Sequence, residues 1–271
     1  MRTTYTFNQF IKENKLWYKT IPQFLEIMEK YPENIVFIDT ETTGLGGSKV
    51  QQLTQVSGIL VDKDFNEISE FDQKIELTDE IKSRMDQDIE FPKGLKVDDQ
   101  KVINPWSTKK ILKFNHYKDG DYEYLNEKEV IDNFFNWLKD YEPYALVAQN
   151  AIFDMNMLGG RYNHKIKSPV IDTKEILQFY FLPLIQKLSE TNPKFKEMVN
   201  SIGNSDRDNG LISSSLSKVG PALNLDMSKY HDSLTDCRIT INMYKEIFKY
   251  LEEYKNVDIS KYQNERIKTK R

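Results

Sequence analysis

The segment from Asn34 to Ile38 is a short apolar run rich in β-branched residues, and it ends directly at an acidic cluster. A run of this kind is typical of a central strand in a sheet. Asp39 and Glu41 follow at its end, and because side chains alternate along an extended chain, both point to the same face. Such a carboxylate pair, followed by a tight turn, is suited to a hard divalent cation such as Mg²⁺, which prefers oxygen ligands. The alternative is a turn whose acids are solvated.

The apolar pattern of the rest of the chain predicts further strands and helices around this one. Two strands joined as a hairpin come next, followed by alternating helices and strands and a long final helix. In chain order, the expected elements are strands at 55–61 and 68–75, a helix opened by Asn126, a strand at 144–148, a helix at 151–160, a short strand at 170–173 and a helix at 234–251. This order predicts an α/β fold with a mixed β-sheet flanked by helices.

The chain has 271 residues, which one elaborated α/β domain can occupy. We expect this domain to span residues 34–254. Two stretches without a clean apolar period, near 78–125 and 176–210, are interpreted as insertions. Residues 1–33 are predicted to form an N-terminal helical extension. Residues 255–271 are interpreted as a basic C-terminal tail without an apolar pattern, which either adds nonspecific attraction to phosphates or is a disordered end.

Composition restricts the class of protein. Hydrophobic residues make up 39% of the chain and aromatics 12%, which is enough for a packed core and excludes disorder throughout. No stretch approaches the roughly 20 apolar residues of a membrane span, and the N-terminus lacks the apolar region of a signal peptide. We therefore expect a soluble, cytoplasmic protein without membrane association. The single cysteine, Cys237, cannot form an internal disulfide. The net charge of −4 argues against a nucleic-acid partner unless bound cations offset the acids.

Two further segments carry acids in places that suit a site. Asp154 lies one turn into a helix that starts at the carboxyl end of a strand, where α/β sheets bind ligands. Its alternative role is that of a first-turn acid favoured by the helix dipole. His231 precedes Asp236, which falls inside the final helix. An aspartate in an apolar-faced helix is costly to bury unless it is paired or bound to a metal.

Taken together and in this order, the three segments resemble the motifs of the DEDDh branch of the DnaQ-like 3′→5′ exonucleases. They read Asp39-Thr-Glu-Thr-Thr-Gly44, Asn150-Ala-Ile-Phe-Asp154 and His231-Asp-Ser-Leu-Thr-Asp236. The resemblance covers residues 34–76 and 126–254. It implies a ribonuclease H-like fold, in agreement with the order of strands and helices.

The resemblance also implies catalysis with two divalent ions, Mg²⁺ or Mn²⁺, and assigns a role to each acid. Asp39 is expected to bridge both ions, and Glu41 and Asp236 to complete the site of the first. Asp154 is expected to hold the second, directly or through water. His231 is the implied general base, since an imidazole with an unperturbed pKa of about 6.5 can accept a proton from water near neutral pH.

The same family contacts the terminal nucleotide with the turn after the first two acids. By resemblance, Thr42, Thr43 and Leu45 are expected to bind substrate, although their structural role would be to form the turn. Asn150 occupies a position that lines the same cleft in the family.

Outside the resemblance, basic and aromatic residues interleave in one part of the first insertion, a pattern that holds phosphates and stacks bases of a single strand. The alternative is a solvated helix face. These residues are Lys109, Lys110, Lys113, Phe114, Tyr117 and Lys118. His116 and His164 match no motif and are interpreted as structural or surface residues.

These observations predict a metal-dependent 3′→5′ exonuclease that acts on single-stranded DNA and releases nucleoside 5′-monophosphates. One alternative is an exoribonuclease that trims RNA ends, since no motif reports contact with a 2′-OH. Another is a proofreading subunit, in which residues 1–33 or 176–210 bind a polymerase or another replication partner. A catalytically silent binding module is the third, and the intact set of acids and histidine counts against it.

Overall fold

The computed structural model describes most of the chain. The described residues are 19–44, 51–86, 96–97, 100–101, 108–117, 124–160, 162, 164–204 and 210–270. Leu45 and much of the predicted N-terminal extension lie outside these ranges.

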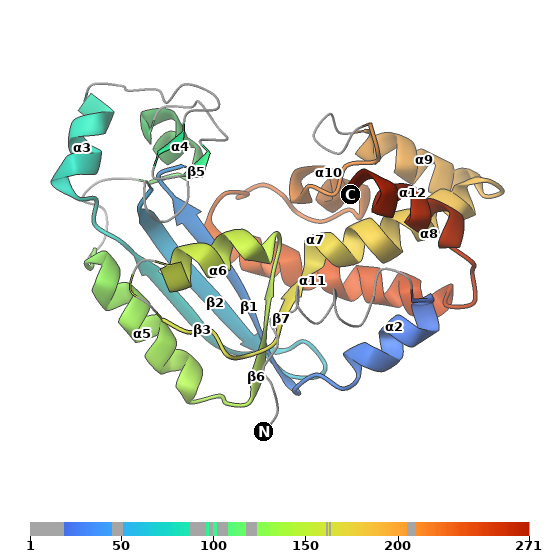
Figure 1. Ribbon diagram of the computed structural model, residues 1–271, viewed down its shortest axis with the longest axis horizontal. Coiled ribbons are helices and arrows are strands. Elements are labelled where there is room, and N and C mark those ends of the chain that lie inside the picture. Colours follow the sequence, from blue (N-terminus) through green and yellow to red (C-terminus); the bar gives the residue numbers. More distant parts are fainter. Residues whose placement is uncertain are drawn as a thin grey trace.

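A five-stranded sheet in the order β3-β2-β1-β6-β7 forms the centre of the fold (Figure 1). The strands are β1 (Asn34–Thr42), β2 (Leu53–Val61), β3 (Glu67–Lys74), β6 (Tyr144–Ala148) and β7 (Val170–Asp172). β1, β2 and β3 are antiparallel neighbours, whereas β6 is parallel to β1 and β7 is parallel to β6. The predicted α/β class, with a mixed sheet flanked by helices, is therefore confirmed.

Helices cover both faces of the sheet (Figure 1). α5 (Glu127–Lys139) packs on β2 and β3, and α6 (Ala151–Gly160) packs on β1, β6 and β7. On the opposite face, α11 (Ser233–Glu253) packs on β1 and β2. Asn126 opens α5 as predicted, because its side chain accepts a hydrogen bond from the main-chain N–H of Glu129 at 3.0 Å.

The N-terminal part of the described chain contributes α2 (Ile21–Met28) to the same core. Its start is fixed by a capping box, in which the side chain of Gln23 accepts a hydrogen bond from the main-chain N–H of Thr20 at 3.0 Å. Phe24 is fully buried and stacks on Tyr180 with ring centroids 4.0 Å apart. The helix is thereby attached to the second predicted insertion.

That second insertion is part of the central core. It contains α7 (Thr173–Ile176), η2 (Leu177–Phe181), α8 (Leu182–Ser189) and α9 (Pro193–Ile202). Its aromatic and aliphatic side chains, such as Phe179, Phe181 and Leu184, are buried in the same hydrophobic cluster as the sheet. Their removal from water stabilises the fold by about 1.5–3 kcal/mol per side chain.

The first insertion keeps a small core of its own. Its described elements are α3 (Asp79–Asp86), β4 (Lys96–Val97), β5 (Gln100–Lys101) and α4 (Thr108–Phe114). Leu77, Ile81 and Leu112 pack together in a cluster separate from the main one. The pairing of β4 with β5 was not expected from the sequence.

The C-terminal segment differs from the expectation of a patternless tail. Residues after α11 form α12 (Ser260–Lys270), which packs on η2 and α8. Gln263 and Arg266 are buried and donate hydrogen bonds to main-chain carbonyls, from Gln263 to Phe179 at 3.0 Å and from Arg266 to Ile212 at 3.0 Å. Because polar side chains fasten this helix, an apolar period in the sequence does not mark it. α10 (Leu216–Ala222) completes the helices.

None of the described helices combines the length and the apolar character that crossing a lipid bilayer demands.

Candidate active site

The acids predicted from three separate segments come together at one end of the sheet. Asp39 and Glu41 lie in β1, whereas Asp154 and Asp236 lie in the first turns of α6 and α11. One ligand atom each from Glu41, His231 and Asp236 all lie within 4.8 Å of one another. Asp39 is close enough to raise the pKa of Glu41, Asp154 and Asp236 through its charge.

A side-chain hydrogen bond at the end of the sheet attaches α6 to β1. The Thr40 hydroxyl donates to Oδ1 of Asp154 at 2.7 Å, and both residues are buried. Thr40 lies between Asp39 and Glu41 and points to the opposite face of the strand. Sequence reasoning did not single out Thr40, because its partner is 114 residues away in the chain.

The start of α11 is attached to the same strand from the other face. The Ser233 hydroxyl donates to the main-chain carbonyl of Asp39 at 2.7 Å. The side chain of Asp232 caps the helix by accepting a hydrogen bond from the main-chain N–H of Thr235 at 3.1 Å. Asp236, one turn further, is thereby directed toward the acids of β1.

His231 and Asn150 both have left-handed backbone conformations beside the acids. Their φ angles are 74° and 69°, a region that costs a residue other than glycine free energy and that clusters at functional sites. The main-chain N–H of His231 donates to both carboxylate oxygens of Asp236, at 3.3 and 3.4 Å. Its ring lies 3.8 Å from that of Tyr230, so the imidazole is held between the tyrosine and the acid cluster.

Burial and mutual repulsion make the carboxyl groups hard to ionise. Burial, followed by the charge of Asp39, raises the pKa of Asp236 to about 9. Burial and the charge of Asp232 raise the pKa of Asp39 to about 7. Burial also raises the pKa of Glu41 and of Asp154, and the charge of Asp39 adds to both shifts. Such concentrated repulsion is what a bound cation would relieve.

A divalent metal ion fits this set of side chains. Four carboxyl groups supply the hard oxygen ligands that Mg²⁺ and Mn²⁺ prefer, and Glu41, His231 and Asp236 form a candidate metal-binding group. Asp39 and Asp154 adjoin this group and would complete the coordination.

The pKa of His231 depends in part on His116, which matches no sequence motif. Burial, followed by the charge of His116, lowers the pKa of His231 to about 4. The imidazole is therefore neutral near pH 7 and able to accept a proton. His116 belongs to the turn after α4, so this part of the first insertion lies near His231.

The residues predicted to bind substrate differ in exposure, since Thr42 and Thr43 are buried and Asn150 is exposed. Thr42 and Thr43 are buried, and their hydroxyls hold the turn: Thr42 donates to the carbonyl of Gly44 at 2.7 Å, and Thr43 donates to Gln51 at 2.8 Å. Asn150 is exposed beside Asp154, and its Oδ1 accepts a hydrogen bond from Lys174 at 3.2 Å. Leu45 lies outside the described residues.

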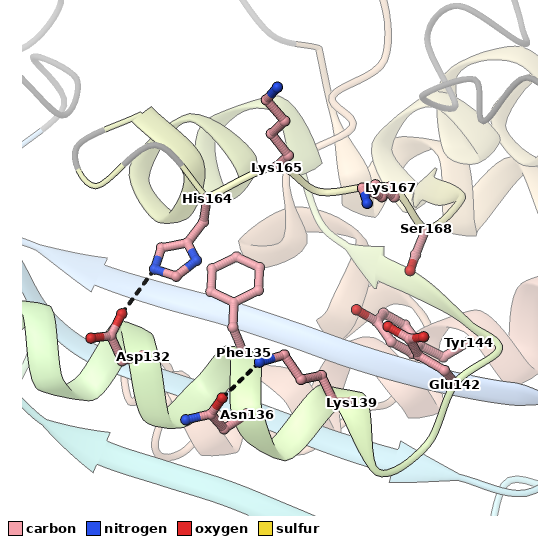
Figure 2. Close-up of a pocket in the computed structure, with 10 residues that line it drawn as sticks. All are labelled: Asp132, Phe135, Asn136, Lys139, Glu142, Tyr144, His164, Lys165, Lys167 and Ser168. Carbon is pink, nitrogen blue, oxygen red and sulfur yellow. Dashed lines mark hydrogen bonds and ion pairs between the residues drawn. The ribbon is translucent and has the colours of Figure 1, made fainter.

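His164 lies away from the acids, in a pocket of about 440 Å³ between α5 and residues 164–168 (Figure 2). Its Nε2 is 3.0 Å from Oδ1 of Asp132, and its ring stacks on Phe135. Tyr144, which also lines this pocket, pairs with Asn34 at the start of β1. The pocket is therefore at the opposite end of the sheet from Asp39, roughly 15–20 Å along the strand.

The strand order and the helices on both faces give the mixed α/β fold that the sequence predicted, and solved structures of exonucleases share this fold. The solved structures that resemble it include E. coli exonuclease I with a dT13 oligonucleotide, at a TM-score of 0.56 and 16% sequence identity, over 82% of this chain and 42% of that chain. E. coli exonuclease I with a dA16 oligonucleotide has a TM-score of 0.51 and 17% sequence identity. A third structure of exonuclease I has a TM-score of 0.51 and 16% identity. Both matches cover 82% of this chain and 44% of the exonuclease I chain.

The chain spans less than half the length of these exonuclease I chains. At such identities the likeness establishes the fold alone. No protein-family model matches the sequence, and none of the curated proteins compared with it does.

Proposed function

We propose that the protein is a metal-dependent 3′→5′ exonuclease that acts on single-stranded DNA and releases nucleoside 5′-monophosphates. The observation that carries the proposal is the convergence of four acids from β1, α6 and α11, and of a histidine just before α11, at one end of the sheet. A purely structural cluster of acids would not keep so many carboxyl groups buried against one another without a cation. The choice of substrate follows the oligonucleotides bound in the exonuclease I structures.

Each side chain has a task in this proposal. Asp39, Glu41, Asp154 and Asp236 would hold two divalent ions, Mg²⁺ or Mn²⁺, which when bound supply the positive charge that activates water and stabilises the leaving 3′ oxygen. His231 removes the proton from the attacking water, because its imidazole is unprotonated near neutral pH and lies beside Glu41 and Asp236. Thr40 keeps the Asp154 carboxylate in place through its hydrogen bond of 2.7 Å.

Among the alternatives, trimming of RNA ends uses the same chemistry, so single-stranded RNA is included among the substrates tested below. The comparisons support no polymerase partner, so the proofreading alternative is not carried forward. The direction of attack is part of the proposal: the last phosphodiester is hydrolysed from the 3′ end, leaving the 5′-phosphate on the released nucleotide.

The test is digestion of end-labelled oligonucleotides, as single-stranded DNA, duplex DNA and single-stranded RNA, with Mg²⁺, with Mn²⁺ and with a chelator. We expect a ladder that shortens from the 3′ end of single-stranded DNA and that stops with the chelator. Asp236→Asn is the matched inactive control, since it removes one carboxylate charge and keeps the side-chain shape. Shortening from the 5′ end, nicking of a closed circle, or equal rates in the chelator would contradict the proposal.

A further inference from the structure

The first insertion is fastened to the strand that carries the acids. The Asn115 side chain is buried, and its Nδ2 donates to the main-chain carbonyl of Thr42 at 3.0 Å. Thr42 directly follows Glu41 in β1. A second attachment comes from Tyr117, whose hydroxyl donates to the main-chain carbonyl of Ile75 at 3.3 Å. α4 and the turn after it are thus held near the end of β1 at which the acids gather (Figure 1).

His116 lies between these two attachments and is exposed. Its φ angle of 53° places it in the left-handed region, so the chain reverses there after the helix. The imidazole is near enough to His231 for the charge of one to act on the other. Two histidines from segments far apart in the sequence therefore lie close to each other, His231 just before α11 and His116 in the insertion.

α4 adds lysines beside this histidine. Lys109 and Lys113 are exposed, and neither forms an ion pair within the part of the chain that the structure describes. They are one turn apart, about 6 Å along the helix axis, and lie on the same face of the helix. The protein has a net charge of −4, and these two lysines lie in the segment that Asn115 attaches to β1.

We propose that α4 and the turn Asn115–Tyr117 form a phosphate-binding wall of the active-site cleft, along which a single DNA strand lies. His116 donates a hydrogen bond to a phosphate close to the scissile bond, and Lys109 and Lys113 contact phosphates further along the strand. Asn115 is a positioning residue, because it acts by holding His116 over the cleft. The inference rests on the proposed function for the identity of the strand and adds to it the residues that hold that strand.

The experiment measures binding of a fluorescein-labelled oligothymidylate by fluorescence anisotropy in the presence of a chelator, over a series of salt concentrations. The variant Lys109→Gln/Lys113→Gln is compared with Lys194→Gln/Lys196→Gln, which removes two exposed lysines of α9. We expect the first pair to lower the slope of log K against log salt by about 1.4, because each lost phosphate contact on a single strand contributes about 0.7. The α9 pair should leave the slope unchanged.

The histidine and its positioning residue are tested together. We expect His116→Ala to weaken binding by about tenfold or more, the loss that follows removal of a hydrogen bond to a charged group. Asn115→Ala should give a similar loss, and the double variant should lose no more than either single variant, because both act through one contact. Melting temperatures show whether each variant is folded at the temperature of the assay. A merely structural asparagine would give losses that add to those of His116→Ala.

Degradation assays on the same proteins separate this inference from the proposed function. If the parent degrades DNA and the α4 and His116 variants bind and degrade as it does, the phosphate-binding wall is overturned and the exonuclease stands. If the parent binds through these residues yet degrades nothing with Mg²⁺ or Mn²⁺, the exonuclease is overturned and the wall stands. A parent that neither binds an oligonucleotide nor degrades one with Mg²⁺ or Mn²⁺ overturns both.

Discussion

Asp236→Asn is expected to stabilise the metal-free protein at pH 8. Asp236 is 5% exposed, and burial together with the charge of Asp39 raises its pKa to about 9 from an ordinary value of 3.8. The folded protein therefore holds a proton on this carboxyl group over a pH range in which the unfolded chain has released it. Asparagine is permanently neutral, and its side-chain oxygen can still accept the hydrogen bond from the His231 main-chain N–H.

The magnitude follows from the shift in pKa. A group whose folded-state pKa is raised contributes stability that is fully present below its unfolded pKa and is lost as the pH rises toward the folded value. At pH 8, about four units above the ordinary value, the limit is about 6 kcal/mol at 1.36 kcal/mol per unit. With the other acids rearranging their protons, we expect a net gain of about 2–4 kcal/mol, or roughly 5–15 °C in melting temperature.

The assay is thermal unfolding of parent and variant in a chelator from pH 4 to pH 9. The melting temperature of the parent should fall across this range more steeply than that of Asp236→Asn, and the two should be close at pH 4. Asp62→Asn is the matched control, because Asp62 lies in a surface turn and its hydrogen bonds with Asn66 lower its pKa, so its loss should bring no gain. Parallel pH profiles for parent and Asp236→Asn would refute the reasoning. Saturating Mn²⁺ should reverse the order, because metal binds the ionised carboxylates of the folded parent.

Three further predictions concern activity. Asp39→Ala should abolish cleavage while the circular dichroism spectrum stays that of a folded protein, and a variant that kept a near-normal rate would remove Asp39 from the site. His231→Ala should lower turnover by roughly 10²–10⁴-fold, with partial recovery at high pH, because loss of a general base affects the transition state. Calorimetry should show its metal affinity unchanged; a large loss would make His231 a ligand instead. Thr40→Val should leave the melting temperature within a few degrees but lower kcat about tenfold or more, because Asp154 loses the hydrogen bond that orients it. An unchanged kcat would show that Asp154 needs no such support.

The central strand and the acid motifs were predictable because their signals are local. The apolar run before Asp39 marks a buried strand in any context, and Asn126 marks the start of α5 by the hydrogen bond that it accepts from Glu129. The placement of Asp154 in the first turn of a helix followed from its distance from the strand at 144–148.

Other features depend on contacts between segments that lie far apart in the sequence. The hydrogen bond from Thr40 to Asp154 and the one from Asn115 to Thr42 each join a side chain to a distant partner, and neither leaves a periodic pattern. His116 matches no sequence motif, and its place near His231 depends on the attachment of Asn115 to β1. α12 was not predicted because two of its buried side chains, Gln263 and Arg266, are polar and only Ile267 is apolar among the buried ones that the structure describes, so no apolar period marks the helix.

The left-handed backbone at His231 bears on how this chain can change over time. Glycine adopts a φ of 74° without steric cost and asparagine at a lower cost than most residues, so a change to either would relieve the strain at this position. A population selected only for folding would therefore tend to lose the histidine. Its presence there marks a residue that contributes something other than stability. Under the proposed function, a change of His231 to glycine would raise the stability of the protein and remove its activity in one step.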